Sequence, residues 1–167
     1  MLDINKIEKF SNLGFGTRKF LQLYRWKNCK PNKLAKLNKQ LNQSNVAIIS
    51  SAGLIDKSNH NPFDHKIKLG DTSFRIIQSD IQENNLEENH RSNSFNHDGI
   101  KSNPFTVMPI NHLKELEKQK FIGSANHRHF SLMGSILNPY KLVANTIPEI
   151  IKILKIDKVD IVILIPV

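Results

Sequence analysis

The chain has 167 residues, of which 39% are hydrophobic, and its formal net charge is +9. This length suits one domain and leaves little room for a second. The single cysteine, Cys29, excludes a disulfide within one chain and a metal cluster built from cysteines. No apolar run is long enough for a membrane span, and residues 1–10 lack the apolar centre of a signal peptide, so we expect a cytoplasmic protein without a membrane partner.

The positive charge is concentrated in residues 1–43, which carry ten Lys or Arg against two acidic residues. Residues 44–167 carry fourteen against thirteen and are nearly neutral. We therefore expect a basic, partly helical N-terminal arm over 1–43 and an α/β domain over 44–167. The aromatic residues Phe20, Tyr24 and Trp26 lie between the charges of the arm, which allows contact with phosphates and stacking on bases. Charge runs are more often solvated faces or docking arms.

The first half of the chain contains two predicted strands. Lys6–Trp26 has a loosely helical spacing of apolar residues that two glycines interrupt. Val46–Ser50 predicts a buried strand that runs into the small residues 51–53, the usual opening of an α/β unit. Phe74–Ile77 predicts a second, short strand. From Ile81 to Pro104 no period is sustained, and such a stretch is usually functional or unstructured.

The second half predicts helix and strand in alternation. Asn111 is expected to cap a helix through Lys120, with Gly123 just beyond its end, and a second helix is expected after the N-cap Thr146. Val159–Val167 is a β-branched run typical of an interior parallel strand, buried on both faces and normally followed by a crossover helix. We predict an α/β fold: a parallel-sheet βαβ three-layer domain that is incomplete at its C-terminus.

Polar residues of the kinds used in catalysis and ligand binding lie in two places. His90, His97 and Asp98 lie in the irregular stretch, whereas His127 and His129 form a His-x-His pair. In extended backbone, residues two apart point to the same side, so the pair can present two imidazoles to one metal or substrate. A metal site would add His90 or Asp98. The alternatives, a substrate pocket or a hydrogen-bonded pair that pins a loop, remain open.

Two further features have structural alternatives. Arg75, between Asp71 and Asp80, suits either a clamp for a substrate carboxylate or an ion pair that ties down a loop. Cys29 lies beside Lys30, whose charge lowers a thiol's pKa, but it has no second cysteine to resolve a disulfide. We do not expect Cys29 to be catalytic.

Five segments follow one another in a recognisable order and spacing: Val46–Leu54, Gly70–Ile77 with Ser79 and Asp80, His90–Gly99, Ile122–Gly134 and Val159–Val167. Together they resemble the selenoprotein B family of glycine, sarcosine, betaine and D-proline reductases, and most of all its short, D-proline-reductase-like members. The resemblance extends from about Trp26 to the end of the sequence.

In that family, a strand like Val159–Val167 leads into a selenocysteine, or a cysteine in some members, followed by Pro-Val-Cys-His and a helix. Because UGA encodes selenocysteine, a UGA read as a stop would end the product after Val167. The resemblance thus implies an inactive, truncated fragment with no metal or cofactor of its own. The implied reaction is reductive cleavage of a C–N bond in an amino acid or amine, with electrons from a dithiol or thioredoxin-like donor.

By the same resemblance, His90, Asp98, His127 and His129 are candidates for substrate positioning or proton delivery. D-proline reductase works with a pyruvoyl-containing subunit, so a partner reductase subunit is expected. The competing interpretation is a small basic domain that contacts nucleic acid or an acidic protein, with nucleic acid the less expected partner. A metal-dependent hydrolase built on His127 and His129 ranks third.

Overall fold

The computed structural model describes residues 14–23, 35–93, 95 and 97–167. The chain divides into two compact units, Met1–Lys36 and Leu37–Val167. In the first unit the structure describes helix α1 (Phe15–Leu23), which lies inside the segment predicted to be loosely helical. Cys29 and the arm's Tyr24 and Trp26 lie outside the described residues. Across the described ranges, no helix has the length and apolar character needed to cross a bilayer.

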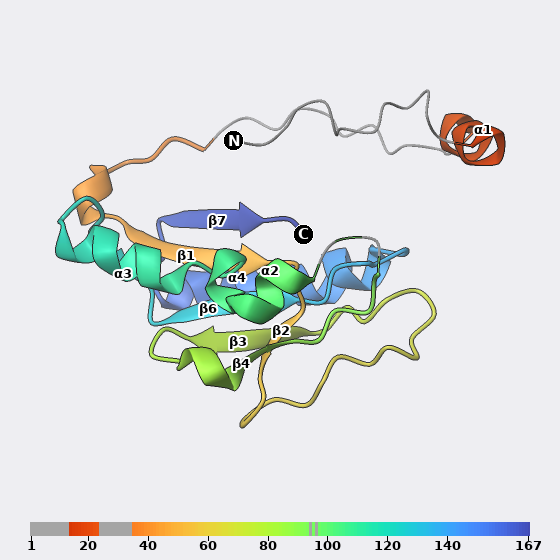
Figure 1. Ribbon diagram of the computed structural model, residues 1–167. Coiled ribbons are helices and arrows are strands. Elements are labelled where there is room, and N and C mark those ends of the chain that lie inside the picture. The colour runs from red at the N-terminus through yellow and green to blue at the C-terminus, as the bar shows by residue number, and fades with distance from the viewer. Residues whose placement is uncertain (1–13, 24–34, 94, 96) are drawn as a thin grey trace. The chain divides into compact units, whose positions relative to one another are not determined.

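A five-stranded sheet forms the centre of the second unit (Figure 1). Its middle strand, β1 (Asn45–Ser50), runs parallel to β5 (Ser124–Ala125) and β6 (Arg128–Leu132) along one side. Along its other side β1 pairs in parallel with β7 (Ile161–Ile165) over five residue pairs. β3 (Phe74–Gln78) is antiparallel to β6 and forms the opposite edge of the sheet. The carboxyl ends of β1, β6 and β7 therefore meet at one edge.

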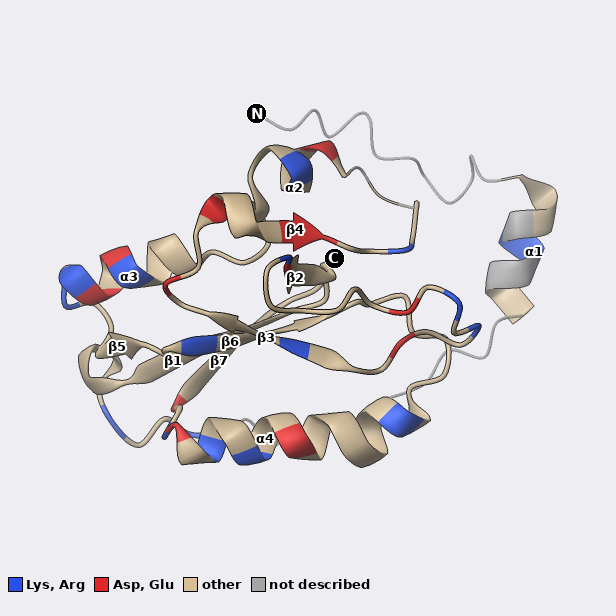
Figure 2. Cartoon of the chain, turned by 90° about the horizontal axis from the view of Figure 1, so that it is seen from below, with Lys and Arg blue, Asp and Glu red and all other residues tan. Residues whose placement is uncertain are grey.

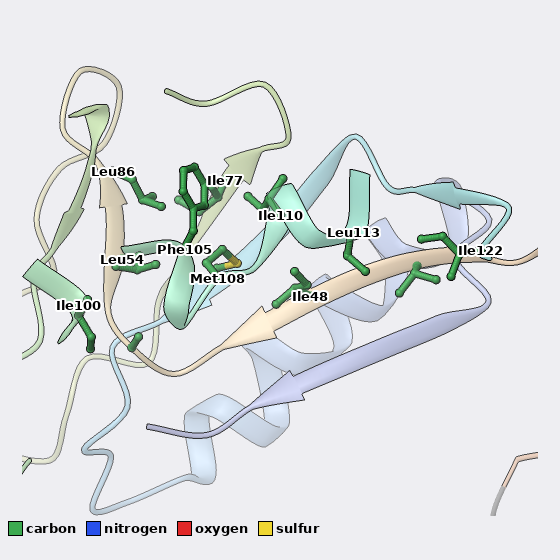
Figure 3. Packing of buried hydrophobic residues seen from close by; sticks show 12 residues of the cluster. Ile48, Leu54, Ile77, Leu86, Ile100, Phe105, Met108, Ile110, Leu113 and Ile122 are labelled. Carbon is green, nitrogen blue, oxygen red and sulfur yellow. The ribbon is translucent and has the colours of Figure 1, made fainter. Parts of the chain in front are cut away.

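β1 is buried because it has neighbours on both sides and cover on both faces. Its central residues Ala47 and Ile48 have no exposed surface, as expected for an interior parallel strand with a continuous apolar run. Ile48 packs with Leu54 and Met108 on one face, as Figure 3 shows, whereas Ile49 packs toward the opposite face. The prediction of a buried strand that opens an α/β unit is confirmed.

Helices cover both faces of the sheet, as Figure 2 shows. One face carries α3 (Ile110–Lys118), α2 (Asp98–Ser102) and an antiparallel ribbon of β2 (Leu54–Asp56) with β4 (Leu86–Glu88). The other face packs against α4 (Ile147–Ile156), whose Ile150 lies against Phe130 and Leu132 of β6. This arrangement confirms the predicted α/β fold with a largely parallel sheet.

The stretch from 81 to 104, which shows no periodic pattern, folds into short elements that single apolar side chains anchor. Leu86 of β4, Ile100 of α2 and Phe105 all join the main core cluster (Figure 3). The structure also describes three short 3-10 helices, at Leu41–Gln43, Glu83–Asn85 and Pro104–Thr106, and a π-helix at Leu142–Thr146. Elements of three to five residues are too short to show a hydrophobic period, which explains why the pattern did not reveal them.

The two predicted helices are present, but their ends differ from the expectation. α3 begins at Ile110 after Pro109, without a side-chain cap, so Asn111 is not its N-cap. After α3, Lys120 rather than Gly123 adopts the left-handed conformation that commonly ends helices, with φ 58°. The helical path that leads into α4 starts before Thr146, whose hydroxyl donates a 2.7 Å hydrogen bond to the carbonyl of Thr72 instead of capping the helix.

The last strand is parallel, as predicted, but it lies at the edge of the sheet. Side chains of a strand alternate between its faces, and β7 exposes one residue on each: Ile163 is 37% exposed and Leu164 is 69% exposed. The run is typical of a strand buried on both faces, and in the described residues both faces remain partly exposed. In the part of the chain that the structure describes, β1 is its only strand neighbour.

An ion pair holds the end of α4 to the start of β6. The guanidinium of Arg128 donates two hydrogen bonds, of 2.7 and 2.6 Å, to the carboxylate of Asp157, whose side chain is only 3% exposed. These hydrogen bonds, followed by a weaker one from Asn126, lower the pKa of Asp157. The pair therefore fixes the position of the turn that leads from α4 to β7.

We predict that Gly123→Ala destabilises the fold. A Cβ atom at Gly123 would lie 2.4 Å from the backbone carbon of Gln43, so the backbone must shift. The free energy of unfolding, measured by urea denaturation, should fall by about 1–3 kcal/mol. Gly99→Ala is the matched control, because its Cβ meets nothing within 4 Å inside α2, and it should be neutral or stabilise by up to about 1 kcal/mol. Equal effects of the two substitutions would contradict this packing.

Candidate active site at the carboxyl ends of the parallel strands

Three chain segments meet where the parallel strands end. The backbone N–H of Ser51, just after β1, donates to the carbonyl of Ile165 in β7 at 3.0 Å, and the Ser51 hydroxyl accepts from the N–H of Val167 at 2.9 Å. On the other side, the N–H of Gly53 donates to the carbonyl of Leu132 in β6 at 2.8 Å. In open α/β sheets this edge is where ligands bind.

His90 reaches this edge because two glycines leave room for it. The N–H of Asn89 donates to the carbonyl of Gly53 at 2.8 Å, which brings the end of β4 against the loop after β1. A Cβ atom at Gly53 would lie 3.1 Å from the backbone of His90, and one at Gly134 would lie 3.0 Å from its Nε2. A Cβ at Gly134 would also lie 2.7 Å from the carbonyl oxygen of Ser51. His90 Nε2 therefore lies close to the loops that follow β1 and β6.

The protonation state of His90 follows from its contacts. Its Nδ1 accepts a 3.0 Å hydrogen bond from the backbone N–H of Ser92, so in the neutral ring the proton is on Nε2. Burial lowers the pKa of His90, which keeps the ring neutral at pH 7. Within the described residues, Nε2 is buried and has no hydrogen-bond partner. His90 thus presents an unused N–H donor at the carboxyl edge of the sheet.

His97 lies close to His90, and Phe95 contacts both rings. The two imidazole centroids are 6.5 Å apart, and the Phe95 ring is 4.9 Å from that of His90 and 4.2 Å from that of His97. His97 contacts Glu88 through Nδ1 and the carbonyl of Ser92 through Nε2. Asp98, the third candidate from this stretch, is exposed in the first turn of α2.

His129 lies at the other end of β6, where its ring takes the place of a missing backbone partner of β1. Between β5 and β6 the backbone ladder is interrupted, and the N–H of Ile48 donates to His129 Nδ1 at 3.1 Å. The Nε2 atom then donates to the Ser79 hydroxyl at 2.9 Å, and that hydroxyl donates to the carbonyl of Asn126. The ring has no exposed surface, and burial lowers its pKa to about 4. Both ring nitrogens are engaged in holding β1, β3 and β6 together.

The structure does not bring the four predicted site residues together. His127 is 65% exposed, with its Nε2 4.0 Å from Asp157, and so lies with the end of α4. At about 3.3 Å per residue, the five steps from His129 to Gly134 along β6 and beyond separate His129 from the His90 region by roughly 16 Å. Within the described ranges, no group of three or more His, Cys, Asp or Glu is placed to hold a metal ion.

Arg75 ties down a loop. Its guanidinium donates to the carbonyls of Asn61 and Pro62, at 2.9 and 3.1 Å, and stacks over the ring of Phe63. The buried carboxylate of Asp71 accepts from backbone N–H groups of the same loop. Arg75 thus ties down a loop, as in the structural alternative, but through backbone carbonyls; among the ion pairs of the described residues none involves Arg75.

Glu88, Phe95, Ser51 and Gly53 also belong to this edge, and sequence reasoning did not select them as site residues. The small-residue run 51–53 after a buried strand was a usable signal for the last two. Glu88 and Phe95 lie in the aperiodic stretch, where no sequence pattern marked them as site residues. Beside these residues a cavity of about 410 Å³ opens on the α4 side; it is lined by Ile49, Ser51, Leu132, Leu164, Ile165 and Pro166.

We predict that His129 makes stability depend on pH. Between about pH 6.5 and pH 4, the unfolded chain protonates this histidine and the folded chain does not, so the free energy of unfolding falls as the pH is lowered, by about 3 kcal/mol in total. His129→Gln should flatten this slope in urea denaturation at a series of pH values. His127→Gln changes an exposed histidine two residues away and should leave the slope as it is. An unchanged slope in His129→Gln would contradict the assignment.

Comparison with known proteins identifies relatives of this chain. Residues 7–166 match the sequence profile of the glycine/sarcosine/betaine reductase selenoprotein B family. The chain is 29% identical over 129 residues to the D-proline reductase subunit gamma of Acetoanaerobium sticklandii, and the match covers 77% of this chain. The chain spans about half the length of that relative, since the match covers 50% of it. No solved structure matches the chain. Because the profile covers nearly all of its residues, the chain belongs to the glycine/sarcosine/betaine reductase selenoprotein B family.

Proposed function

We propose that this chain forms the amino-terminal part of a reductase that cleaves a C–N bond in an amino acid or amine. Its active site would form at the carboxyl ends of β1, β6 and β7. The observation that carries the proposal is the buried Nε2–H of His90, which has no hydrogen-bond partner in the described part of the chain and lies beside Gly134. Family membership supports the reaction class, and open α/β sheets generally bind ligands at this edge.

The reaction needs a nucleophile, two electrons and a proton for the carbon. We propose that a selenocysteine or cysteine follows Val167 in the longer protein and attacks the substrate carbon, so that a bond from selenium or sulfur to carbon forms while the C–N bonding pair leaves with the amine. One thiol of a dithiol donor, of the thioredoxin type, would then attack the selenium or sulfur, and the bonding pair to carbon would stay on the carbon, which takes up a proton. The second thiol would release the selenol or thiol and close the disulfide of the donor. The departing nitrogen carries the C–N bonding pair as a lone pair, and the neutral His90 imidazole, with its hydrogen on Nε2, is suited to donate a hydrogen bond to it.

The exposed side of β7 supports the idea that a further segment packs there. Leu164 is 69% exposed, and with Leu132 and Pro166 it lines the apolar cavity at the carboxyl edge. A helix that crosses over from β7 would cover such a face, as in other parallel α/β units. We propose that the downstream part of the longer protein provides this helix and that the nucleophile lies at its amino end, where the helix dipole lowers the pKa of a selenol or thiol.

The remaining parts of the proposal concern the setting of the enzyme. We place it in the cytoplasm, where dithiol donors are kept reduced, and expect it to act with a partner reductase subunit. The relative from Acetoanaerobium sticklandii is itself named as a subunit of D-proline reductase, which supports a multi-subunit assembly. We propose no metal and no other cofactor in this chain. His127, His129 and Asp98 lie away from His90 Nε2 or are exposed, so the proposal uses His90 as the hydrogen-bond donor to the departing nitrogen.

The proposal is tested on the longer protein carrying the selenocysteine or cysteine, with a dithiol as the electron donor. Glycine, sarcosine, betaine and D-proline are offered in turn, and the cleaved product is quantified. His90→Asn should lower kcat about 100-fold with little change in KM, the usual size of the loss of one well-placed hydrogen-bond donor in an active site. His112→Asn alters an exposed histidine on α3 and should have no effect. Dithiol-dependent turnover that survives His90→Asn would overturn the role of His90, and no turnover of any amine or amino acid would overturn the reaction class.

A further inference from the structure

Glu88 and His97 form a buried polar pair next to His90. The Nδ1 atom of His97 lies 2.5 Å from the Oε1 atom of Glu88, and its Nε2 atom lies 2.8 Å from the carbonyl oxygen of Ser92. The side chain of Glu88 is 5% exposed and that of His97 is 19% exposed. Each ring nitrogen of His97 thus faces an oxygen, and neither oxygen brings a hydrogen of its own when Glu88 is ionised.

This geometry fixes the charge of the pair. A carbonyl oxygen only accepts, so His97 Nε2 must carry a hydrogen. The buried carboxylate of Glu88 likewise needs a donor, which His97 Nδ1 supplies only when it also carries a hydrogen. With Glu88 ionised, His97 is an imidazolium ion paired with the carboxylate, and the pair as a whole is neutral. A charge-assisted hydrogen bond of this kind is stronger than one between neutral groups.

The pair is connected to His90 through the backbone of Ser92. The carbonyl of Ser92 accepts from His97, and the N–H of Ser92 donates to His90 Nδ1 at 3.0 Å. The ring of Phe95 contacts both imidazoles, at 4.2 Å from His97 and 4.9 Å from His90. The position of Ser92 decides which nitrogen of His90 carries the proton, because its N–H occupies Nδ1.

Burial is the largest influence on the pKa of His90 and lowers it. The backbone hydrogen bond with Ser92 and the charge of Glu88 act in the opposite direction, whereas the charges of His97 and His65 add to the effect of burial. The net shift is downward, which favours the neutral ring. Its Nε2–H then lies against Gly134, where a Cβ atom would come within 3.0 Å.

We propose that Glu88 and His97 are positioning residues that hold His90 as a neutral imidazole with its proton on Nε2. Neither side chain is required to contact the substrate, since both act through Ser92 and Phe95. The meaning of this arrangement for catalysis rests on the proposed function, whereas the charge of His97 and the tautomer of His90 do not.

The first test measures the histidine rings directly in this chain. Nitrogen-15 NMR of the imidazoles at pH 7 should show both nitrogens of His97 bearing hydrogens and His90 bearing one, on Nε2. In Glu88→Gln, His97 should lose one of its two ring hydrogens. His90 should then become a mixture of tautomers, because His97 fixes the backbone of Ser92 less firmly. Glu87→Gln makes the same change at an exposed residue of the same strand and should leave both rings as they are.

Glu88→Asp keeps the carboxylate, so His97 should retain hydrogens on both nitrogens. This variant distinguishes an effect of the lost charge from an effect of disrupted folding. A neutral His97 in the unsubstituted chain at pH 7, or a His90 tautomer that Glu88→Gln leaves unchanged, would overturn the proposal.

The second test uses turnover by the longer protein. Glu88→Gln should lower kcat about tenfold and leave KM nearly unchanged, and Glu88→Asp should restore most of it. If His90→Asn lowers kcat and Glu88→Gln does not, the positioning role is wrong while the proposed function stands. If neither substitution affects turnover but the NMR signatures of both rings are as expected, the proposed role of His90 is wrong while the charge assignment of the pair stands.

Discussion

The fold depends on one constraint, the complete burial of the backbone of β1. Ala47 and Ile48 have no exposed surface, so every backbone donor and acceptor of this strand needs a partner inside the protein. β6 and β5 provide partners on one side and β7 on the other, all in parallel. Where the ladder is interrupted, the N–H of Ile48 is satisfied by the ring of His129 instead. Parallel neighbours on both sides bring three carboxyl ends to one edge of the sheet.

This constraint also explains where polar chemistry accumulates. The loops that leave the three strands must pass close to one another, and Gly53 and Gly134 allow that approach. The ribbon of β2 and β4 carries His90 into the space that these glycines leave open. The aperiodic stretch from 81 to 104 thus places the imidazole of His90 near the carboxyl edge, with His97 and its partner Glu88 beside it.

The elements that could be predicted from sequence are those with a strong local pattern. β1 and β7 are apolar runs rich in β-branched residues, and α3 has helical spacing with a basic residue, Lys118, in its last turn, so each was recognisable. The antiparallel direction of β3 was not, because strand direction is set by tertiary pairing with β6 rather than by residues 74–78. The edge position of β7 was missed for the same reason. β2 and β4 have three residues each, which is too few for any period.

The candidate site was predictable in part. His90 was selected from its place in the irregular stretch, and the structure places it near the loops that follow β1 and β6. The His-x-His pair was weighed as two ligands for one target, with a loop-pinning role as the alternative. The buried ring of His129, bonded at both nitrogens, matches the second interpretation. Sequence spacing cannot distinguish the two, because both require the same residues two apart. Glu88 was not selected, because its importance arises only from the contact with His97.

The central claim is that the carboxyl edge of β1, β6 and β7 is where this family's chemistry takes place. The most direct measurement is a crystal structure of the longer protein with a bound substrate or product. We expect the reactive selenium or sulfur atom to lie at that edge, with His90 Nε2 within hydrogen-bond reach of the substrate nitrogen, directly or through one water. A reactive atom located elsewhere, such as at the amino end of β6 near His129, would contradict the claim.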